Sequence, residues 1–257
     1  MILRRIKAHV EKENWFAVGI DFCIVVVGVF IGLQVANWND ARADVSRGQD
    51  YRQRLAEDMV INRQNLQGRR STYLEQSEYG TFAIETNGTP VTDANAWEIV
   101  RAYFQASHAF TLTLQRGTYD EIISSGHLAL LDDQALVNDL AALYTFAGLS
   151  TISTIPDYRE RVRRIIPLTL QAYFQSACYN VTDQDIHLLI ACPPPPNAEI
   201  DLIALASILQ SDSELERDLR YMMSLSQVSA GMAANQTKRV DAIFARLPPP
   251  KTGGRQP

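Results

Sequence analysis

The stretch "DFCIVVVGVFIGLQVANW", residues 21–38, is the most apolar part of the chain and decides how the fold is interpreted. A helix from Trp15 to Trp38 rises about 1.5 Å per residue and reaches roughly 35 Å, enough to cross a hydrocarbon core of about 30 Å. Tryptophans bracket the segment, and aromatic side chains suit both membrane interfaces. The sequence therefore predicts a transmembrane helix over residues 15–38.

A cleaved signal peptide is the competing interpretation of this segment. Its uninterrupted apolar core, residues 22–33, is short, and "ARA" at residues 41–43 fits a small-x-small cleavage site. Asp21, Trp38 and the absence of a turn-forming break before "ANWNDARADV" favour an uncleaved anchor. We therefore expect the anchor to remain attached.

One face of the predicted span carries an acid and small residues. At 100° per residue, this face holds Asp21, Gly28, Gly32 and Ala36. "GVFIG" has the small-x-x-x-small spacing that lets two helices approach closely, and an acid near the membrane boundary needs water or a hydrogen-bonding partner. These four residues are predicted to form a transmembrane association face for a second copy or a partner's helix. Chance glycines, with Asp21 reaching interfacial water, are the alternative.

Two blocks of the sequence resemble a known family. "NWFAVGIDFCIVVVGVFIGLQVANWNDAR", residues 14–42, resembles the N-terminus of a widespread family of uncharacterised bacterial proteins. "GTYDEIISSGHLALLDDQALVNDLAALY", residues 117–144, is similar to that family's second recurring block. The resemblance implies a bacterial membrane anchor followed by a helical domain of unknown function. It implies no reaction, ligand or site residue.

The composition limits the function classes. The chain has 257 residues, of which 46% are hydrophobic and 21% charged, and its net charge is -5. This composition suits one sizeable globular domain. Without an extended basic block, nucleic-acid binding is not expected. The four histidines, at positions 9, 108, 127 and 187, lack metal-ligand spacing, so neither a metal nor a cofactor is predicted.

The cysteines bear on the orientation of the chain. Lys and Arg residues on the two sides of the span nearly balance, so charge indicates orientation only weakly. Cys178 and Cys192 are separated by "YNVTDQDIHLLIA", expected to be a short loop, and are followed by four prolines. This arrangement fits a disulfide in an oxidising compartment, which in a bacterium is the periplasm. Two unrelated buried thiols are the alternative, because spacing does not reveal connectivity.

Beyond the span the sequence predicts helices. Apolar residues from Tyr51 to Tyr73 recur at helical spacing, which predicts one long amphipathic helix ended by "ETNGTPVTD" at residues 85–93. "EIDLIALASIL" is apolar nearly all round and is expected in the core. The helix over residues 213–247 has a seam that is small and polar at its centre. The seam comprises Leu215, Leu219, Met222, Ser226, Ser229, Ala233, Gln236, Val240, Ile243 and Leu247.

The block "TYDEIISSG", residues 118–126, has a structural interpretation. Thr118 and Glu121 have capping-box spacing, and Gly126 stands where a helix C-terminus favours a left-handed residue. Asp132 or Asp133 is expected to cap the next helix. Ser124 beside acidic residues lacks a nucleophile-elbow motif, so we expect no hydrolytic site.

Four arginines cluster between two prolines. In "IPDYRERVRRIIP", Pro156 is expected at a helix start and Pro167 to kink the same helix. Arg159, Arg161, Arg163 and Arg164 are predicted as an anion contact for a ligand or lipid headgroups. A solvated face paired with acidic neighbours is the alternative.

These observations predict an all-α fold: a single N-terminal transmembrane helix followed by an antiparallel helical-bundle domain. We expect a short cytoplasmic segment at 1–14, the helix at 15–38, a helical soluble domain at 39–247 and a disordered tail at 248–257. The predicted function is a non-catalytic, membrane-tethered interaction or scaffold protein in the bacterial inner membrane, with its soluble domain in the periplasm. Its expected partners are the lipid bilayer and a second copy or a partner's transmembrane helix. The alternative is a ligand-binding sensor accessory, which would use the polar centre of the last helix as its pocket and the arginine cluster as its anion contact.

Overall fold

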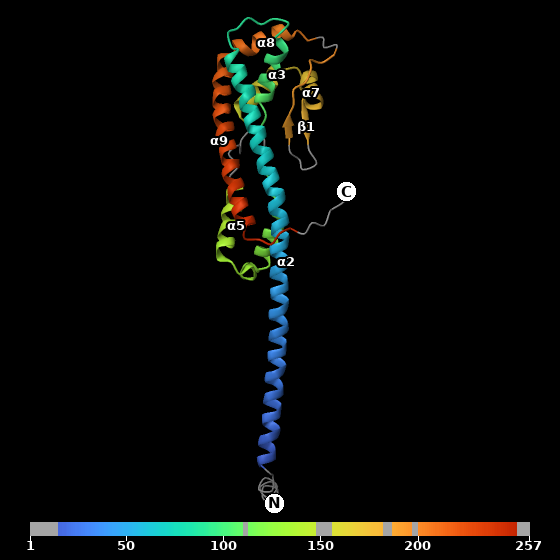
Figure 1. Cartoon of the computed structure of the whole chain (residues 1–257). Helices are drawn as coiled ribbons and strands as arrows, with labels where there is room; N and C mark the ends of the chain where they lie inside the picture. The colour runs from blue at the N-terminus through green and yellow to red at the C-terminus, as the bar shows by residue number, and fades with distance from the viewer. Residues whose placement is uncertain (1–14, 110–112, 148–155, 182–186, 197–199, 251–257) are drawn as a thin grey trace, which may run out of the picture. The chain divides into compact units, whose positions relative to one another are not determined.

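The computed structural model describes residues 15–109, 113–147, 156–181, 187–196 and 200–250 (Figure 1). Within these ranges the chain is all-α apart from one two-stranded hairpin, which confirms the predicted fold class. It divides into two compact units, Met1–Asp50 and Tyr51–Pro257. One helix, α2 (Trp15–Glu85), contributes to both units. The predicted segment at 1–14 and residues 251–257 of the predicted tail lie outside the described residues.

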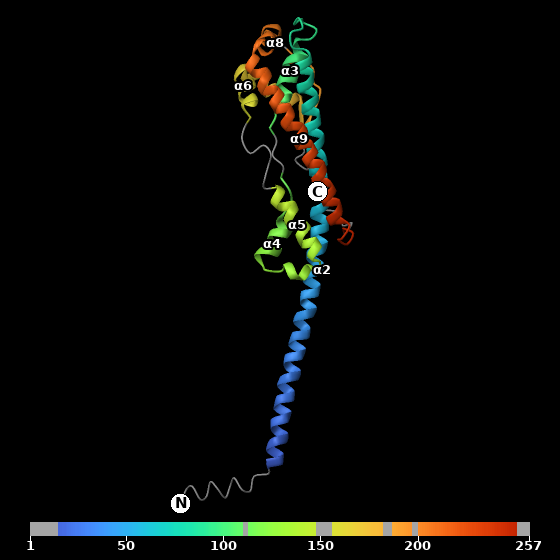
Figure 2. The same ribbon diagram turned by 90° about the vertical axis from the view of Figure 1, so that its left-hand side faces the viewer.

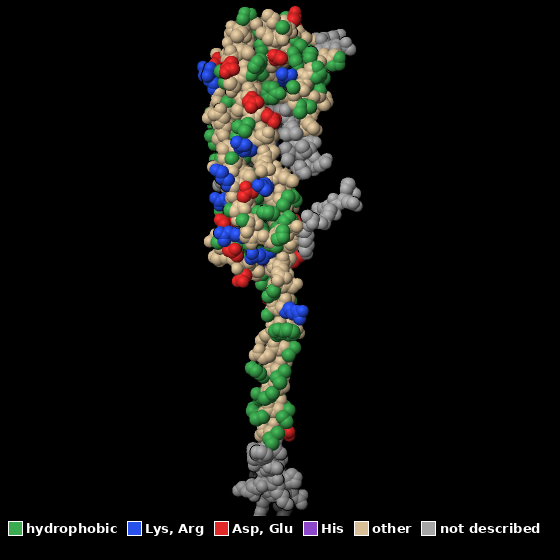
Figure 3. All heavy atoms as spheres, viewed as in Figure 1, with side chains coloured by type: hydrophobic (Ala, Val, Ile, Leu, Met, Phe, Trp, Pro, Cys, Tyr) green, Lys and Arg blue, Asp and Glu red, His purple; other side chains and the backbone are tan. Residues whose placement is uncertain are grey.

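The first unit contains the apolar part of α2. Large hydrophobic side chains from Ile20 to Trp38 are exposed, and Figure 3 shows such side chains along the face in view. In the described part of the chain, α2 is the helix that is long and apolar enough to cross a membrane. Its backbone stays helical past Trp38, as the sequence predicts, because no glycine or proline follows that residue before Gly48. Residues 39–50 belong to this unit rather than to the second.

The second unit is built on two antiparallel helices, the remainder of α2 and α9 (Ser213–Phe244). Arg63 pairs with Asp241 across 3.0 Å, and further along α2 Gln76 lies 3.1 Å from Ser226. Residue numbers on α9 fall as those on α2 rise, so the two chain directions are opposed. Figures 1 and 2 both show the helices side by side.

One hydrophobic cluster lies where α2 enters this unit. There α4 (Gly117–Ser124), the short 3₁₀ helix η1 (Leu128–Leu131) and α5 (Gln134–Ala147) pack with both long helices. The cluster includes Tyr51, Leu55, Met59, Leu66, Ile122, Leu136, Leu140, Leu143, Val240 and Ile243. Asp133 accepts a hydrogen bond from the Leu136 backbone N–H at 2.9 Å, which confirms it as the cap of α5.

A second hydrophobic cluster lies toward the C-terminal end of α2. It gathers α3 (Ala96–Ala106), α6 (Asp157–Ile165), α7 (Leu168–Ala177) and α8 (Leu202–Ser211) around the N-terminal half of α9. Strands β1 (Tyr179–Val181) and β2 (His187–Leu189) form an antiparallel hairpin in which Tyr179 pairs with Leu189. This hairpin was not predicted, because the sequence indicates only a loop between the two cysteines. The strands are three residues each, too short for an alternating pattern to stand out.

The predicted seam of α9 is confirmed within the helix. Its members from Leu215 to Ile243 are all buried, including the small and polar centre. The amphipathic pattern of α2 is confirmed too, because Tyr51, Leu55, Met59, Leu66 and Tyr73 are buried. The helix ends at Glu85, and Gly88 in the following turn has a φ of 79°.

One prediction about helix extent was wrong, and one about helix burial held only in part. Pro167 does not kink one helix but separates α6 from α7, because Ile166 before it adopts an extended backbone with ψ 126°. The helix α8 is not buried all round: Leu205, Ala206 and Leu209 face the core, whereas Ile208 is 53% exposed.

The capping-box prediction for Thr118 was also wrong. Helix α4 begins at Gly117, so Thr118 lies inside its first turn and is buried. Thr118 instead lies beside the buried Asp58 of α2, whose Oδ2 atom has no hydrogen-bond partner in the described structure. The predicted stop is confirmed, because Gly126 has a φ of 71° and His127 N–H bonds to the Ile122 carbonyl at 2.9 Å.

Candidate functional site

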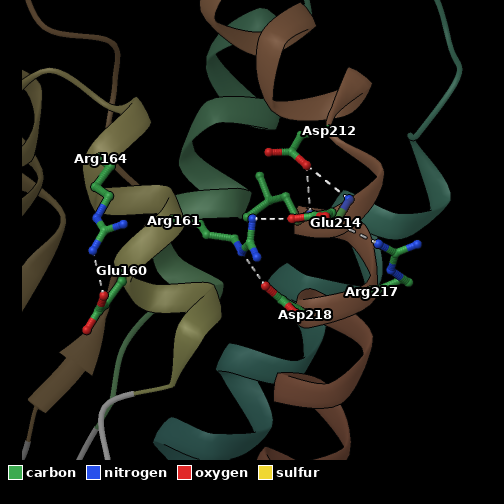
Figure 4. Close-up of polar contacts among 8 residues, drawn as sticks. Glu160, Arg161, Arg164, Asp212, Glu214, Arg217 and Asp218 are labelled. Atoms are coloured by element: carbon green, nitrogen blue, oxygen red, sulfur yellow. Dashed lines mark hydrogen bonds and ion pairs between the residues drawn. The ribbon is translucent and has the colours of Figure 1, made fainter.

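The four arginines of α6 are divided between two environments. Figure 4 shows Arg161 reaching across to α9, where its guanidinium lies 2.7 Å from Glu214 and 2.6 Å from Asp218. Arg164 pairs instead with Glu160 of its own helix at 2.9 Å. Both side chains are exposed, so solvent screens these pairs. This half of the cluster follows the alternative of a solvated face paired with acidic neighbours.

The other two arginines make different contacts. Arg159 donates from Nη1 to the Ser107 carbonyl at 3.2 Å. Arg163 places its guanidinium carbon 3.6 Å from the centre of the Phe104 ring, in the second hydrophobic cluster. The structure therefore does not bring all four guanidinium groups to one site, and it separates Arg159 and Arg163 from the exposed pair.

Arg163 has buried donors that are not used. Its Nε and Nη2 atoms are shielded from solvent and have no hydrogen-bond partner in the described structure. Burial lowers the pKa of Arg163 to about 9, and the nearby charge of Arg159 acts in the same direction. The group still carries its charge at neutral pH. A buried charge without a partner is costly, so this position is a candidate for binding.

A hydrogen-bond network fills the polar centre of the α9 seam. Gln76 of α2 donates from Nε2 to the carbonyls of Ala106 and His108, at 2.8 and 2.6 Å. The Ser226 hydroxyl donates to Gln76 Oε1 at 3.1 Å. The Gln76 side chain thus occupies the space opposite Ser226, where the sequence allowed a pocket. Close packing, the other outcome that small residues permit, is the one observed here.

A pocket that the sequence does not predict lies between α2 and α3. This pocket has a volume of about 470 Å³ and is lined by Glu75, Glu78, Tyr79, Phe82, Glu98, Arg101 and Ala102. Its residues come from both sides of the turn after α2. Glu75 and Glu78, one turn apart on α2, line the pocket together with Glu98 of α3. Their spacing matches no binding motif, so the sequence gives no sign of the pocket.

The two soluble cysteines are joined, as the sequence predicts. Cys178 and Cys192 form a disulfide with 5.0 Å between their Cα atoms, and both are buried. Trp97 Nε1 donates to the Cys192 carbonyl at 2.9 Å, and Gln105 Nε2 donates to the Cys178 carbonyl at 3.0 Å. These bonds from α3 hold both ends of the disulfide loop in place.

The predicted transmembrane association face is open. Asp21, Gly28, Gly32 and Ala36 are all exposed, and a Cβ atom on either glycine would meet nothing within 4 Å. A shallow groove runs beside Gly28 and is lined by Gly19, Ile20, Cys23, Ile24, Val27, Gly28 and Ile31. The groove includes Gly28 but not Asp21, Gly32 or Ala36. Association through this face stays a prediction.

The polar residues of "TYDEIISSG" have local partners. Arg116 pairs with Asp120 at 2.7 Å, Arg54 pairs with Glu121, and the Ser124 hydroxyl donates to the Glu121 carbonyl at 3.1 Å. Next to this block, Tyr51 Oη and His127 Nδ1 are 2.9 Å apart. These contacts give Asp120, Glu121 and Ser124 structural partners.

In comparisons with known proteins, no family model, no curated protein and no solved structure matches the chain.

Proposed function

We propose that this chain is a membrane-tethered interaction or scaffold protein rather than an enzyme. The observation that carries the proposal is the continuity of α2. This one helix supplies an apolar segment of membrane-spanning length and then one of the two long helices of the second unit. The same helix thus supplies both the candidate membrane span and part of the core of the second unit.

The proposed location is the bacterial inner membrane, crossed once, with the second unit in the periplasm. The Cys178–Cys192 disulfide supports this side, because disulfides persist in oxidising compartments and are rare in the cytosol. The resemblance of residues 14–42 to bacterial anchors supports the bacterial membrane.

The proposed interaction runs through the span itself, with a second copy or with a partner's helix. Exposed small residues at positions 28 and 32 support it, since they let a neighbouring backbone approach closely. Asp21 would meet a hydrogen-bonding partner on the same face.

The test combines crosslinking within membranes with purification in mild detergent. Gly28→Ile and Gly32→Ile should weaken the crosslinked species, because the added side chains block close approach. Val26→Ile is the matched control, since Val26 lies on the opposite side of the helix at 100° per residue. Equal crosslinking in all three variants would contradict association through this face. Recovery of the chain alone, without crosslinks, would contradict the interaction function.

A second candidate function is a ligand-binding sensor accessory that acts through a partner protein. The unused donors of Arg163 are the observation that favours it. Gln76 fills the space at the centre of α9 that the sensor alternative would use as its pocket, so a ligand site would have to lie elsewhere in the second unit.

A further inference from the structure

The unused atoms of Arg163 form a matched pair. Nε–H and the adjacent Nη2–H point in parallel from one edge of a guanidinium, and this edge fits two oxygens of a carboxylate or phosphate group. The Phe104 ring covers the face of the same guanidinium at 3.6 Å. Stacking on the ring uses the flat face of the guanidinium and leaves the N–H donors in its plane available for hydrogen bonds. In the described structure both donors of this edge are buried and without a hydrogen bond.

Unused donors are not a general feature of the arginines on α6. Arg161 has two carboxylates within 2.7 Å, and Arg164 has one at 2.9 Å. Among the described residues, no carboxylate acts on the pKa of Arg159 or Arg163. Within the described ranges, the more buried arginines of the helix are thus the ones without a negative partner.

Positive charge accumulates around Tyr179 of β1. The guanidinium groups of Arg69, Arg159 and Arg163 each lie near enough to lower its pKa, although burial, the larger effect, raises it. Burial also raises the pKa of Tyr158 well above its ordinary value. Neither phenol therefore supplies a negative charge at neutral pH. Three elements, α2, α6 and β1, converge on a positively charged region.

We propose that Arg163 and Arg159, beside Tyr179, bind a small oxyanion bearing a carboxylate or phosphate group through the Nε–Nη2 edge of Arg163. The site takes two of the four arginines that the sequence pointed to, and it excludes Arg161 and Arg164. It gives the second unit a ligand site that is independent of association through the span.

The test measures thermal unfolding of the full-length protein in detergent, with inorganic phosphate or succinate added at constant ionic strength. A bound anion should raise the melting temperature with a saturable dependence on its concentration. Comparing the two anions distinguishes a phosphate site from a carboxylate site. Arg163→Gln should abolish the saturable rise, and Arg163→Lys should weaken the apparent affinity by about tenfold, because lysine lacks the parallel donors.

Arg164→Gln is the matched control, since it removes the same charge from the next position and breaks only an exposed pair. It should keep the wild-type response. A rise that does not saturate, or that is equal in all variants, would be a general salt effect and would overturn the proposal. A wild-type protein that responds to neither anion would also overturn the proposal.

Discussion

The Met223 side chain on α9 occupies the space beside Gly80 on α2 that a Cβ atom at position 80 would need. Glycine at this position lets the two long helices of the second unit approach closely. Four residues away on α2, Gln76 meets Ser226 at 3.1 Å. The small residues of both helices therefore serve their packing against each other.

Gly80→Leu should destabilise the protein by about 1–3 kcal/mol, because overpacking forces Met223 or the helix backbone to move. Gly231→Ala is the matched control on α9, where an added Cβ meets nothing within 4 Å. It should stabilise the helix by about 1 kcal/mol. Urea unfolding of the two variants measures both effects. An unchanged free energy of unfolding in Gly80→Leu would contradict the close packing of α2 and α9.

Asp58→Asn should reduce the pH dependence of stability. Burial raises the pKa of Asp58 above its ordinary value of 3.8, against the lowering effects of Thr118 and Arg54. A group with a raised pKa in the folded state stabilises below its unfolded pKa, and this contribution is lost as the pH rises through the folded pKa. Wild type should therefore lose more stability than Asp58→Asn between pH 4 and neutral pH.

Urea unfolding at a series of pH values measures this difference. Glu85→Gln, at an exposed position near the other end of α2, should retain the wild-type slope. Parallel pH profiles for wild type and Asp58→Asn would show that Asp58 is not buried as described.

Thr118→Ala should cost about 1 kcal/mol, since it removes a buried side chain that lies beside the buried Asp58 carboxyl. Ser124→Ala should change stability by less than about 0.5 kcal/mol, because its exposed hydroxyl bonds only within its own turn. Thermal and urea unfolding provide the comparison. Loss of a cellular phenotype in Ser124→Ala at unchanged stability would instead indicate a functional site in "TYDEIISSG".

The Cys178–Cys192 bond closes a loop with a sequence separation of 14 residues. Replacing both cysteines by serine should cost about 3 kcal/mol, which is the usual contribution for a loop of this size. In protein purified without reductant, an alkylating reagent added after unfolding should label Cys23 alone. Labelling at Cys178 and Cys192 would contradict the disulfide. The argument for a periplasmic location that rests on the disulfide would then fail as well.

Long periodic patterns made most of the fold predictable. The stripes of α2 and α9 extend over many turns, so single departures such as the exposed Leu74 do not obscure them. Gly126 and Asp133 were also predictable, because a left-handed stop and an N-cap depend on local chemistry. The surroundings of Thr118 were not predictable, because Asp58 lies far from it in the sequence and only the packing of α4 on α2 brings the two residues together.

The candidate site was predictable only in part. The sequence singles out four arginines, but which of them faces a carboxylate depends on where α9 passes. Burial of Arg163 follows from the packing of α6 against Phe104 of α3, and the break at Pro167 ends α6 directly after these residues. Charge spacing alone therefore could not separate the exposed pair from Arg159 and Arg163.

The most direct test of the membrane tether is the intact mass of a C-terminally tagged chain recovered from carbonate-washed membranes. An uncleaved anchor predicts the full 28.8 kDa of the chain plus the tag in the membrane fraction. A soluble species that lacks residues 1–43 would show that the apolar segment is a cleaved signal peptide and would contradict the account.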